Sequence, residues 1–473
     1  MNTKNFISQA QSVYFKEDEL PSNIKRLQDE NIHLVAIDRG FGGTKVLSAN
    51  GKHMFPSYVS KINTNEIHLF NEKDIFIMLD NSVYRLGDEI RNQVKNSFDT
   101  SEVNLIYNTK DLLDSKEYIV SNLAALALSL VNDPKEFLDP NPLVFNKEIM
   151  LVLGLPISET TSENINKIME LMTDIPKFAI RTYNAPKWKE IKVNIKKENI
   201  EVTGQPLGTL QSLVRTIDGN YTDKAETLYS SAEGQVLILD GGYGTFDTVI
   251  LNSGMVINGA TWDNCAMQSI LSETIENIHD ELVTAGQTNA LKLSTIGVEK
   301  TLVKCLEEGV PYVHRERKKN INYTIEDIED LFDRAIKNKA AIVTNNITNN
   351  YGDYERLRVV LTGGTTKLMQ QYLEKYCNAN EMGFFWSEED GYEDEIYNFD
   401  SVFANVYGYY AQKIAAIFGK NNWPLLTDFY DEDSEDEVDN VEESEVAATE
   451  EEPNLEVIEA VKKTSKSKKT NTK

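Results

Sequence analysis

Cysteine and histidine are scarce in this sequence. The three cysteines, Cys265, Cys305 and Cys377, are odd in number and form no CxxC pair. We therefore expect reduced thiols and no disulfide framework. The five histidines form no HExxH motif and no Cys/His cluster, which argues against a structural zinc site.

Long apolar segments are also lacking. No run reaches the roughly 18 apolar residues that a membrane-spanning helix needs. The first residues lack the basic-then-apolar order of a signal peptide. We expect a cytoplasmic protein without membrane contact, in which residues 1–31 form a flexible N-terminal extension.

Positive charge is in short supply, because 48 Lys and Arg face 75 Asp and Glu for a net charge of -27. This argues against direct DNA binding, whose non-specific part comes from neutralising phosphates with Lys and Arg. Contact with DNA would need a basic adaptor. Residues 428–473 hold 16 acidic and 6 basic residues and are predicted to be a disordered acidic tail with a basic end. A solubilising role is favoured over docking of a partner.

Glycine, in contrast, is concentrated in two similar stretches. "HLVAIDRGFGGTKVLSANG" spans residues 33–51 and "QVLILDGGYGTFDTVILNSG" spans residues 235–254. Each has an apolar run, an Asp, a glycine turn, a second apolar run and a closing Gly. Asp38 and Asp240 lie 202 positions apart, too far for one supersecondary unit. A duplicated architecture would explain the repetition.

The rest of the body mixes helical and strand patterns. "SKEYIVSNLAALALSLVNDP" has helical spacing with a Ser start and a Pro stop, whereas "KEIMLVLGLPIS" is typical of a buried strand. "RLRVVLTGGTTKLMQQYLEKY" predicts strand, glycine turn and helix, and "NFDSVFANVYGYYAQKIAAIF" predicts a last helix. Such alternation indicates an α/β fold in two similar halves with a nucleotide-sized cleft between them.

The glycine turns need a chemical explanation beyond their shape. Tight hairpins use Gly for positive φ whatever their function, and neither turn has the P-loop or GxGxxG order. Hairpin N–H groups would have to bind any phosphate. The hairpin shape does not explain Asp38 and Asp240 at the mouths of the turns, nor Lys45. Two carboxylates suit a hydrated Mg²⁺ ion, and a lysine suits phosphate. In the third turn, residues 362–366, glycines would let a base or ribose approach the backbone.

These residues resemble a known superfamily. "AIDRGFGGTK" and "LDGGYGTFD" are similar to the two phosphate motifs, and "LTGGTTKL" to the adenosine motif, of actins, DnaK-type chaperones and sugar kinases. The resemblance implies an actin-like fold of two duplicated ribonuclease-H-like domains closing on ATP and Mg²⁺. "MFPSYVS", "YRLGDEI", "LGLPIS" and "FANVYGYYAQ" further resemble ParM-type actins, over residues 32–420. The implied domains are 32–204 and 205–427, the latter with a final helix returning to the first domain.

The resemblance also implies roles for individual residues. Asp38 and Asp240 would hold Mg²⁺ through water and Lys45 would contact phosphates. Gln205 would orient the attacking water, although a polar residue that merely begins a helix is the alternative for this position. The remaining nucleotide-binding candidates are Gly40, Phe41, Gly42, Gly43, Thr44, Gly241, Gly242, Tyr243, Gly244, Thr245, Gly363, Gly364 and Thr365.

The family implies a filament-forming ATPase, using ATP or GTP, that segregates plasmid or phage DNA. Its partners would be further copies of itself and a basic DNA-binding adaptor of the ParR type. One alternative is a DnaK-like chaperone ATPase, but such proteins place a long β-rich domain after the adenosine motif, where we expect few ordered residues. Another is a small-molecule kinase with Asp247 as base, unless Asp247 is simply a hydrogen-bonded strand residue.

Overall fold

The computed structural model describes most of the chain in front of the acidic segment. The described residues are 10–69, 74–87, 113–175, 177–182, 185–229, 234–286, 295–316, 320–352, 357–386 and 401–420. The predicted acidic tail, residues 428–473, lies outside the described residues.

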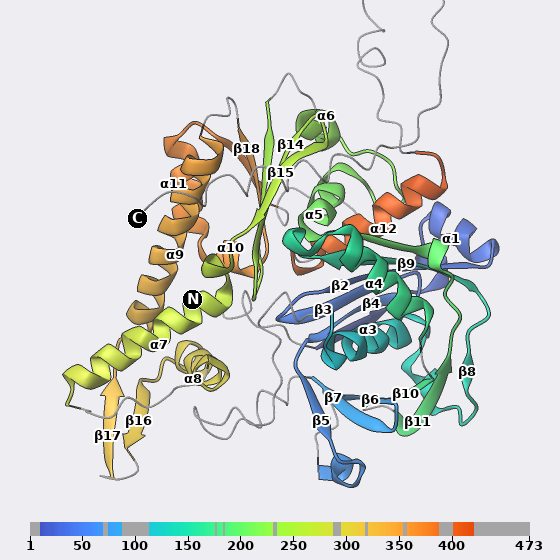
Figure 1. Ribbon diagram of the computed structural model, residues 1–473, viewed down its shortest axis with the longest axis horizontal. Coiled ribbons are helices and arrows are strands. Elements are labelled where there is room, and N and C mark those ends of the chain that lie inside the picture. Colours follow the sequence, from blue (N-terminus) through green and yellow to red (C-terminus); the bar gives the residue numbers. More distant parts are fainter. Residues whose placement is uncertain are drawn as a thin grey trace, which may run out of the picture. The chain divides into compact units, whose positions relative to one another are not determined.

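The first half of the chain is built on a six-stranded mixed sheet (Figure 1). Strands β2, β3 and β4 form an antiparallel meander, and β9 and β12 run parallel to β2. The order across the sheet is β1-β4-β3-β2-β9-β12. The strands are β1 (Gln11–Tyr14), β2 (Ile32–Arg39), β3 (Gly43–Ser48), β4 (Gly51–Pro56), β9 (Glu148–Leu155) and β12 (Ile200–Gly204).

The second half repeats this topology in a five-stranded sheet of order β15-β14-β13-β18-β19. Strands β13, β14 and β15 form the antiparallel meander, and β18 and β19 run parallel to β13. The duplication predicted from the two glycine stretches is therefore present as two sheets of the same strand order, apart from β1, which has no counterpart in the second sheet. The strands are β13 (Val236–Gly241), β14 (Phe246–Asn252), β15 (Met255–Thr261), β18 (Arg358–Thr362) and β19 (Gly383–Trp386).

Helices cover both faces of the first sheet. Because side chains alternate along a strand, Val35 and Ile37 of β2 face the core under α3 (Lys116–Ser129), whereas Leu34 and Ala36 face the core under α12 (Ala404–Ile417). Helix α3 begins after Ser115, whose hydroxyl accepts from the N–H of Tyr118, as the sequence predicted. Helix α4 (Ser162–Thr173) packs beside β12.

Smaller elements extend each half. The first half carries a second sheet of β5 (Val59–Ile62), β6 (Ile75–Leu79), β7 (Ser82–Leu86), β8 (Leu143–Val144), β10 (Phe178–Thr182) and β11 (Ala185–Lys192). The second half carries α6 (Lys224–Tyr229), α7 (Met267–Thr284), α8 (Thr295–Glu308), the hairpin β16 (Tyr312–Glu316) and β17 (Ile321–Ile325), α9 (Ile328–Tyr351), α10 (Gly364–Leu368) and α11 (Gln370–Ala379).

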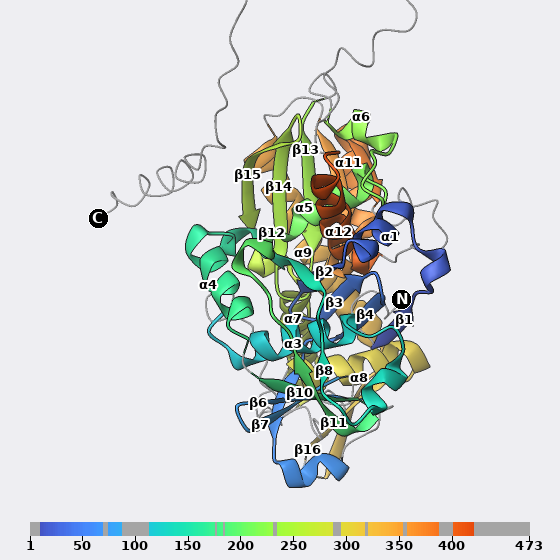
Figure 2. The ribbon, with the colours of Figure 1, turned by 90° about the vertical axis from the view of Figure 1, so that its right-hand side faces the viewer.

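Two helices connect the halves. Helix α5 (Gln205–Val214) follows β12, so the predicted boundary between residues 204 and 205 falls at its start. Figures 1 and 2 show α5 and α12 side by side, and α12 also packs on β2, β3 and β9. Gly408 makes this close crossing possible, because a Cβ added there would lie 1.7 Å from the carbonyl oxygen of Gly208.

The N-terminal segment differs from its prediction. Residues 10–31 are not a flexible extension: β1 pairs antiparallel with β4, and α1 (Ser22–Asp29) follows. The apolar residues of this segment lie in the core beside α12; they are Phe15, Leu20, Ile24 and Leu27. Asp218 stabilises the start of α1, because its carboxylate accepts a hydrogen bond from the backbone N–H of Asn23 at 2.8 Å. The prediction for residues 1–31 was thus wrong for 10–31, because this segment buries an apolar face.

The cysteines behave as their number suggested, since Cys265, Cys305 and Cys377 are all free and buried. Within the described ranges, no helix combines the length and the apolar character needed to cross a membrane.

Candidate functional site

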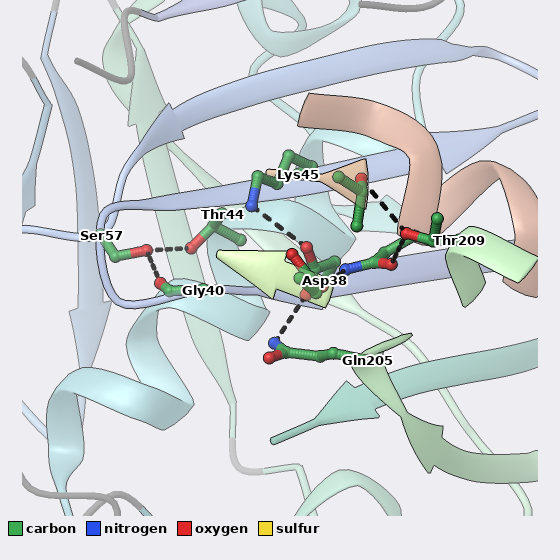
Figure 3. Close-up of polar contacts among 10 residues, drawn as sticks. Asp38, Gly40, Thr44, Lys45, Ser57, Gln205 and Thr209 are labelled. Atoms are coloured by element: carbon green, nitrogen blue, oxygen red, sulfur yellow. Dashed lines mark hydrogen bonds and ion pairs between the residues drawn. The ribbon is translucent and has the colours of Figure 1, made fainter. Parts of the chain in front are cut away.

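The first glycine turn joins β2 to β3 and is fixed by a serine beyond β4. Ser57 Oγ donates to the carbonyl oxygen of Gly40 at 2.7 Å (Figure 3). Ser57 Oγ also lies 2.8 Å from Thr44 Oγ1, and since its single proton is used by Gly40, Thr44 is the donor. Asp38 at the end of β2 lies opposite Lys45 of β3, with 3.1 Å between Lys45 Nζ and Asp38 Oδ2. The turn therefore holds an ion pair at its mouth.

The second glycine turn joins β13 to β14 and is held by the third. The N–H of Gly241 donates to Thr366 Oγ1 at 2.9 Å, and Thr365 Oγ1 donates to the carbonyl oxygen of Gly242 at 2.7 Å. Thr365, predicted to bound the nucleoside, thus uses its hydroxyl to fix the second turn. The second and third turns form one hydrogen-bonded unit.

Gly363 in the third turn is required by its surroundings. Its φ of 86° lies in the left-handed region, which favours glycine. A Cβ there would lie 2.4 Å from the carbonyl oxygen of Gly241 and 2.8 Å from Asp240 Oδ1. The third turn can approach the carboxylate only without a side chain. Gly364 begins α10 directly after it.

The first and second turns contact each other although they belong to different halves. A Cβ on Gly244 would lie 2.5 Å from Cγ of Phe41, and a Cβ on Gly42 would lie 2.9 Å from Cβ of Tyr243. Each turn therefore places an aromatic side chain on a glycine of the other. This packing by itself explains why positions 42 and 244 are glycine.

Two side-chain amides from the connecting helices hold the two turn carboxylates. Gln205 Nε2 donates to Asp38 Oδ1 at 2.7 Å (Figure 3), and Asn405 Nδ2 donates to Asp240 Oδ2 at 3.0 Å. Thr209 Oγ1 donates to Asn405 Oδ1 at 2.8 Å, linking α5 to α12. The sequence named Gln205 as a candidate to orient the attacking water, but it assigned no role to Asn405 or Thr209.

The pKa of Asp240 is higher than that of an ordinary aspartate. Burial and the nearby charge of Asp38 together raise the pKa of Asp240 to about 6, against the opposing effects of the bond from Asn405 and the charge of Lys45. The ionised form of Asp240 is thus less favourable than that of a carboxyl in water, although Asn405 and Lys45 partly stabilise it. A cation at this position would stabilise the ionised form.

The donor set fits one kind of metal ion better than others. Asp38 and Asp240 are the carboxylates at the turn mouths, and among the described residues no group of three or more His, Cys, Asp or Glu side chains is placed to enclose a metal. Zinc and calcium favour more protein ligands than this. Mg²⁺ keeps several waters and needs one or two carboxylates plus phosphate oxygens, so these two residues fit Mg²⁺.

Asp247 shows the features of a bonded strand residue. It lies directly opposite Asp240 in the β13–β14 ladder. It accepts from Thr261 Oγ1 and from the backbone N–H of Ile157 at 3.3 Å. Burial, together with the nearby charge of Asp240, raises the pKa of Asp247 to about 7. Of the two readings of Asp247, these bonds favour the structural one over a kinase base.

Arg39 is a charged residue of the first turn to which the sequence assigned no role. Its guanidinium is buried near the rings of Phe41 and Tyr118, 5.7 and 5.9 Å from their centroids. Burial lowers the pKa of Arg39 to about 10, and Asp38 is among the charges that oppose this. The first turn therefore carries two cations, Lys45 and Arg39, beside a single carboxylate.

Comparison with known proteins agrees with this architecture. Residues 36–208 match the family described as the N-terminal domain of actin-like proteins. No curated protein matches the chain.

Solved structures resemble the chain over most of its length. A pCBH ParM, described as a non-polymerisable quadruple mutant, is 20% identical over 83% of this chain and 100% of its own, with a TM-score of 0.55. The actin-like protein Alp7A is 14% identical over 82% of this chain and 98% of its own, with a TM-score of 0.55. A Bacillus thuringiensis ParM hybrid protein with ADP, containing two ParM mutants, is 14% identical over 82% of this chain and 49% of its own, with a TM-score of 0.50. The predicted actin-like fold and the resemblance to ParM-type proteins are confirmed.

Proposed function

We propose, from the actin-like fold that this chain shares with ParM-type proteins, that it is an ATPase that assembles into filaments in response to nucleotide. One observation carries the proposal. Asp38 and Asp240 end equivalent strands of the two halves, and each is bound by an amide of a connecting helix. A ligand that contacts both turns would therefore act on both halves and on the helices that join them.

Different residues of the turns would bind Mg²⁺ and the phosphates of the nucleotide. Mg²⁺, when bound, would neutralise charge on the phosphates and on the two carboxylates. Asp38 and Asp240 would hold it through water. Lys45 would meet the phosphates as a point charge, and the N–H groups of the first two glycine turns would surround them. GTP would be bound by the same phosphate contacts.

Gln205 would orient the water that attacks the terminal phosphate. Its amide nitrogen is used by Asp38, so its amide oxygen is the atom that would accept from that water. A bond forms between the water oxygen and the γ-phosphorus, the bond to the β–γ bridging oxygen breaks, and ADP and phosphate leave with the protons of the water. Such a reaction asks the protein mainly for positioning and for stabilisation of charge.

Assembly would follow from the state of the nucleotide. A ligand shifts a conformational equilibrium only through its different affinity for the two states. The γ-phosphate would bridge the two turns and favour one arrangement of the halves, which hydrolysis would release. The description of the pCBH relative as a non-polymerisable mutant supports the polymer, and the description of the Bacillus thuringiensis relative as a protein with ADP supports the nucleotide.

The cellular task that fits best is segregation of plasmid or phage DNA. With a net charge of -27, the chain would reach DNA through a basic adaptor of the ParR type and would not bind it directly. A mobility-shift experiment with plasmid DNA at low salt should show no complex for this chain alone.

A sedimentation experiment with parallel phosphate measurement tests the proposal. The full chain is centrifuged with Mg-ATP, with Mg-ADP and without nucleotide, together with Asp240→Ala and with Asp280→Ala as control. Asp280 has a side chain that is 85% exposed on α7, so its loss should change nothing. We expect wild type and control to pellet with Mg-ATP and to release phosphate, and Asp240→Ala to release none.

Two results would overturn it. Phosphate release without pelleting under any nucleotide would point to a chaperone or kinase of the same fold. Pelleting that is identical in all three nucleotide conditions would show that assembly does not depend on the glycine turns.

A further inference from the structure

Tyr409 presents a buried hydroxyl that the preceding account does not use. The side chain is 1% exposed on α12. Its hydroxyl has no hydrogen-bond partner among the residues that the structure describes. Leaving such a group unpaired in a protein interior destabilises the folded state. A purely structural position would therefore be better occupied by phenylalanine.

Two glycines make room for this ring. A Cβ on Gly154 of β9 would lie 2.2 Å from the Tyr409 hydroxyl oxygen, and a Cβ on Gly208 of α5 would lie 2.4 Å from Tyr409 Cε1. The ring thus extends from α12 into the space between β9 of the first sheet and helix α5. Its hydroxyl ends directly against the backbone of Gly154.

This position is next to Asp38. Ile37 of β2 pairs with Leu153 of β9, so Asp38 and Gly154 are the next neighbours along the two strands. Leu34 and Ala36 face the core that contains Tyr409, and by alternation Asp38 points to the same face of the sheet. Neighbouring strands lie about 4.8 Å apart, so the Tyr409 hydroxyl at Gly154 and the Asp38 side chain lie on the same face of the sheet, one strand apart.

The electrostatics agree with this placement. Burial raises the pKa of Tyr409 well above its ordinary value, and Asp38, Asp240 and Asp247 raise it further. The phenol therefore remains protonated and can donate a hydrogen bond toward the carboxylates. A water at this place would have three polar partners, the Tyr409 hydroxyl, the Asp38 carboxylate and the Gln205 amide oxygen, which is within the usual range for buried water.

We propose that Tyr409 is a positioning residue of the hydrolytic site, whose hydroxyl holds a water molecule against Asp38 and Gln205. This inference rests on the proposed ATPase function. It adds a third group, from the last helix, to the two that the sequence predicted. It also gives a reason for an unpaired hydroxyl at a position where phenylalanine would pack equally well.

Tyr409→Phe tests the inference because it removes only the hydroxyl. Tyr410→Phe is the control, since Tyr410 is equally buried on the same helix. Steady-state phosphate release with Mg-ATP gives kcat and KM, and thermal unfolding gives Tm. We expect Tyr409→Phe to lower kcat about 10-fold, with KM changed less than about 2-fold and Tm equal to or above that of wild type. Tyr410→Phe should keep the kcat of wild type.

A fall in rate without a fall in stability is the result that packing alone cannot produce. The inference is overturned if Tyr409→Phe keeps the kcat of wild type, or if both variants lose rate and Tm together. A wild type that releases no phosphate overturns the proposed function and this inference with it. Failure of the proposed function is therefore seen in the wild type alone, whereas failure of this inference is seen only when the variants are compared with an active wild type.

Discussion

The two glycine hairpins share their topology but differ in charge. Asp38 has Lys45 as its cross-strand partner, seven positions later, and pairs with it at 3.1 Å. Asp240 has Asp247 as its cross-strand partner, also seven positions later. The same place in the duplicated fold therefore holds a base in the first half and an acid in the second.

This difference indicates how the two halves would share a ligand. The first hairpin provides its own cation and suits the phosphates. The second hairpin has two carboxyls, Asp240 and the buried Asp247, and their surroundings raise the pKa of Asp240 to about 6 and that of Asp247 to about 7. Its charge calls for an external cation, so we expect Mg²⁺ to depend more on Asp240 than on Asp38. The two hairpins keep the same geometry and differ in charge, so we expect them to contribute differently to ligand binding.

The largest effect is expected where the two halves are joined. Gly408→Ala places a methyl group 1.7 Å from the carbonyl oxygen of Gly208, so α12 and α5 must separate and carry Asn405 and Gln205 apart. Overpacking against backbone should cost about 3 kcal/mol or more of unfolding free energy, measured by urea denaturation. Gly383→Ala is the control, because its Cβ would meet only Arg358 Cγ at 3.6 Å. Equal midpoints for both variants would contradict the close crossing.

The next largest effect is a difference between the two halves in how their stability depends on pH. Burial lowers the pKa of His33 on β2 and of His53 on β4 to about 4, below the ordinary 6.5. Since the folded state binds the proton more weakly than the unfolded chain, the stabilisation is complete above pH 6.5 and is lost as the pH falls from 6.5 toward 4. The loss should approach about 3 kcal/mol for each histidine.

Hydrogen exchange at pH 7 and pH 5 would check this prediction peptide by peptide. We expect β2, β3 and β4 of the first sheet to lose more protection than β13 and β14 of the second. His53→Phe keeps a ring beside Tyr14, which it contacts edge-on, and should remove part of the pH dependence. An unchanged pH dependence in this variant would show that His53 does not contribute.

Local features of the sequence predicted the hairpins but not their supports. Asp38 and Asp240 follow apolar runs and precede glycines, a pattern visible within ten residues. Ser57, Thr209 and Asn405 are recognisable only through partners that the fold brings near, such as Asn405 to Asp240 across 165 positions. A hydrogen bond of that span leaves no local pattern.

The prediction of a flexible N-terminal segment was wrong for the same physical reason. Strand β1 gains its hydrogen bonds from β4, whose residues 51–56 begin far along the chain. Taken alone, residues 10–31 are polar with few apolar side chains, which favours disorder. Burial of Ile24 and Leu27 against the core beside α12 reverses that preference.

Gln205→Ala should have the largest effect on the chemistry alone. The water would lose its orienting acceptor, so phosphate release should fall about 100-fold, while nucleotide affinity stays within about 3-fold. Gln211→Ala is the control, because Gln211 lies on the same helix and donates to Tyr229 at 2.9 Å. If both variants weaken nucleotide binding equally, Gln205 is a helix-start residue without a part in hydrolysis.

Asn405→Ala should produce a smaller effect of a different kind. Asn405 supports Asp240, which makes no ion pair with the described residues, so its loss should raise the Mg²⁺ concentration needed for half-maximal phosphate release by about 10-fold. The rate at saturating Mg²⁺ should change little. Thr209→Val removes the hydroxyl that anchors Asn405 at 2.8 Å while keeping the shape, and should shift the Mg²⁺ requirement in the same direction by less. If Gln205→Ala shifted the Mg²⁺ requirement as much as Asn405→Ala, the two halves would not divide metal and water between them, and the difference in charge would have no functional meaning.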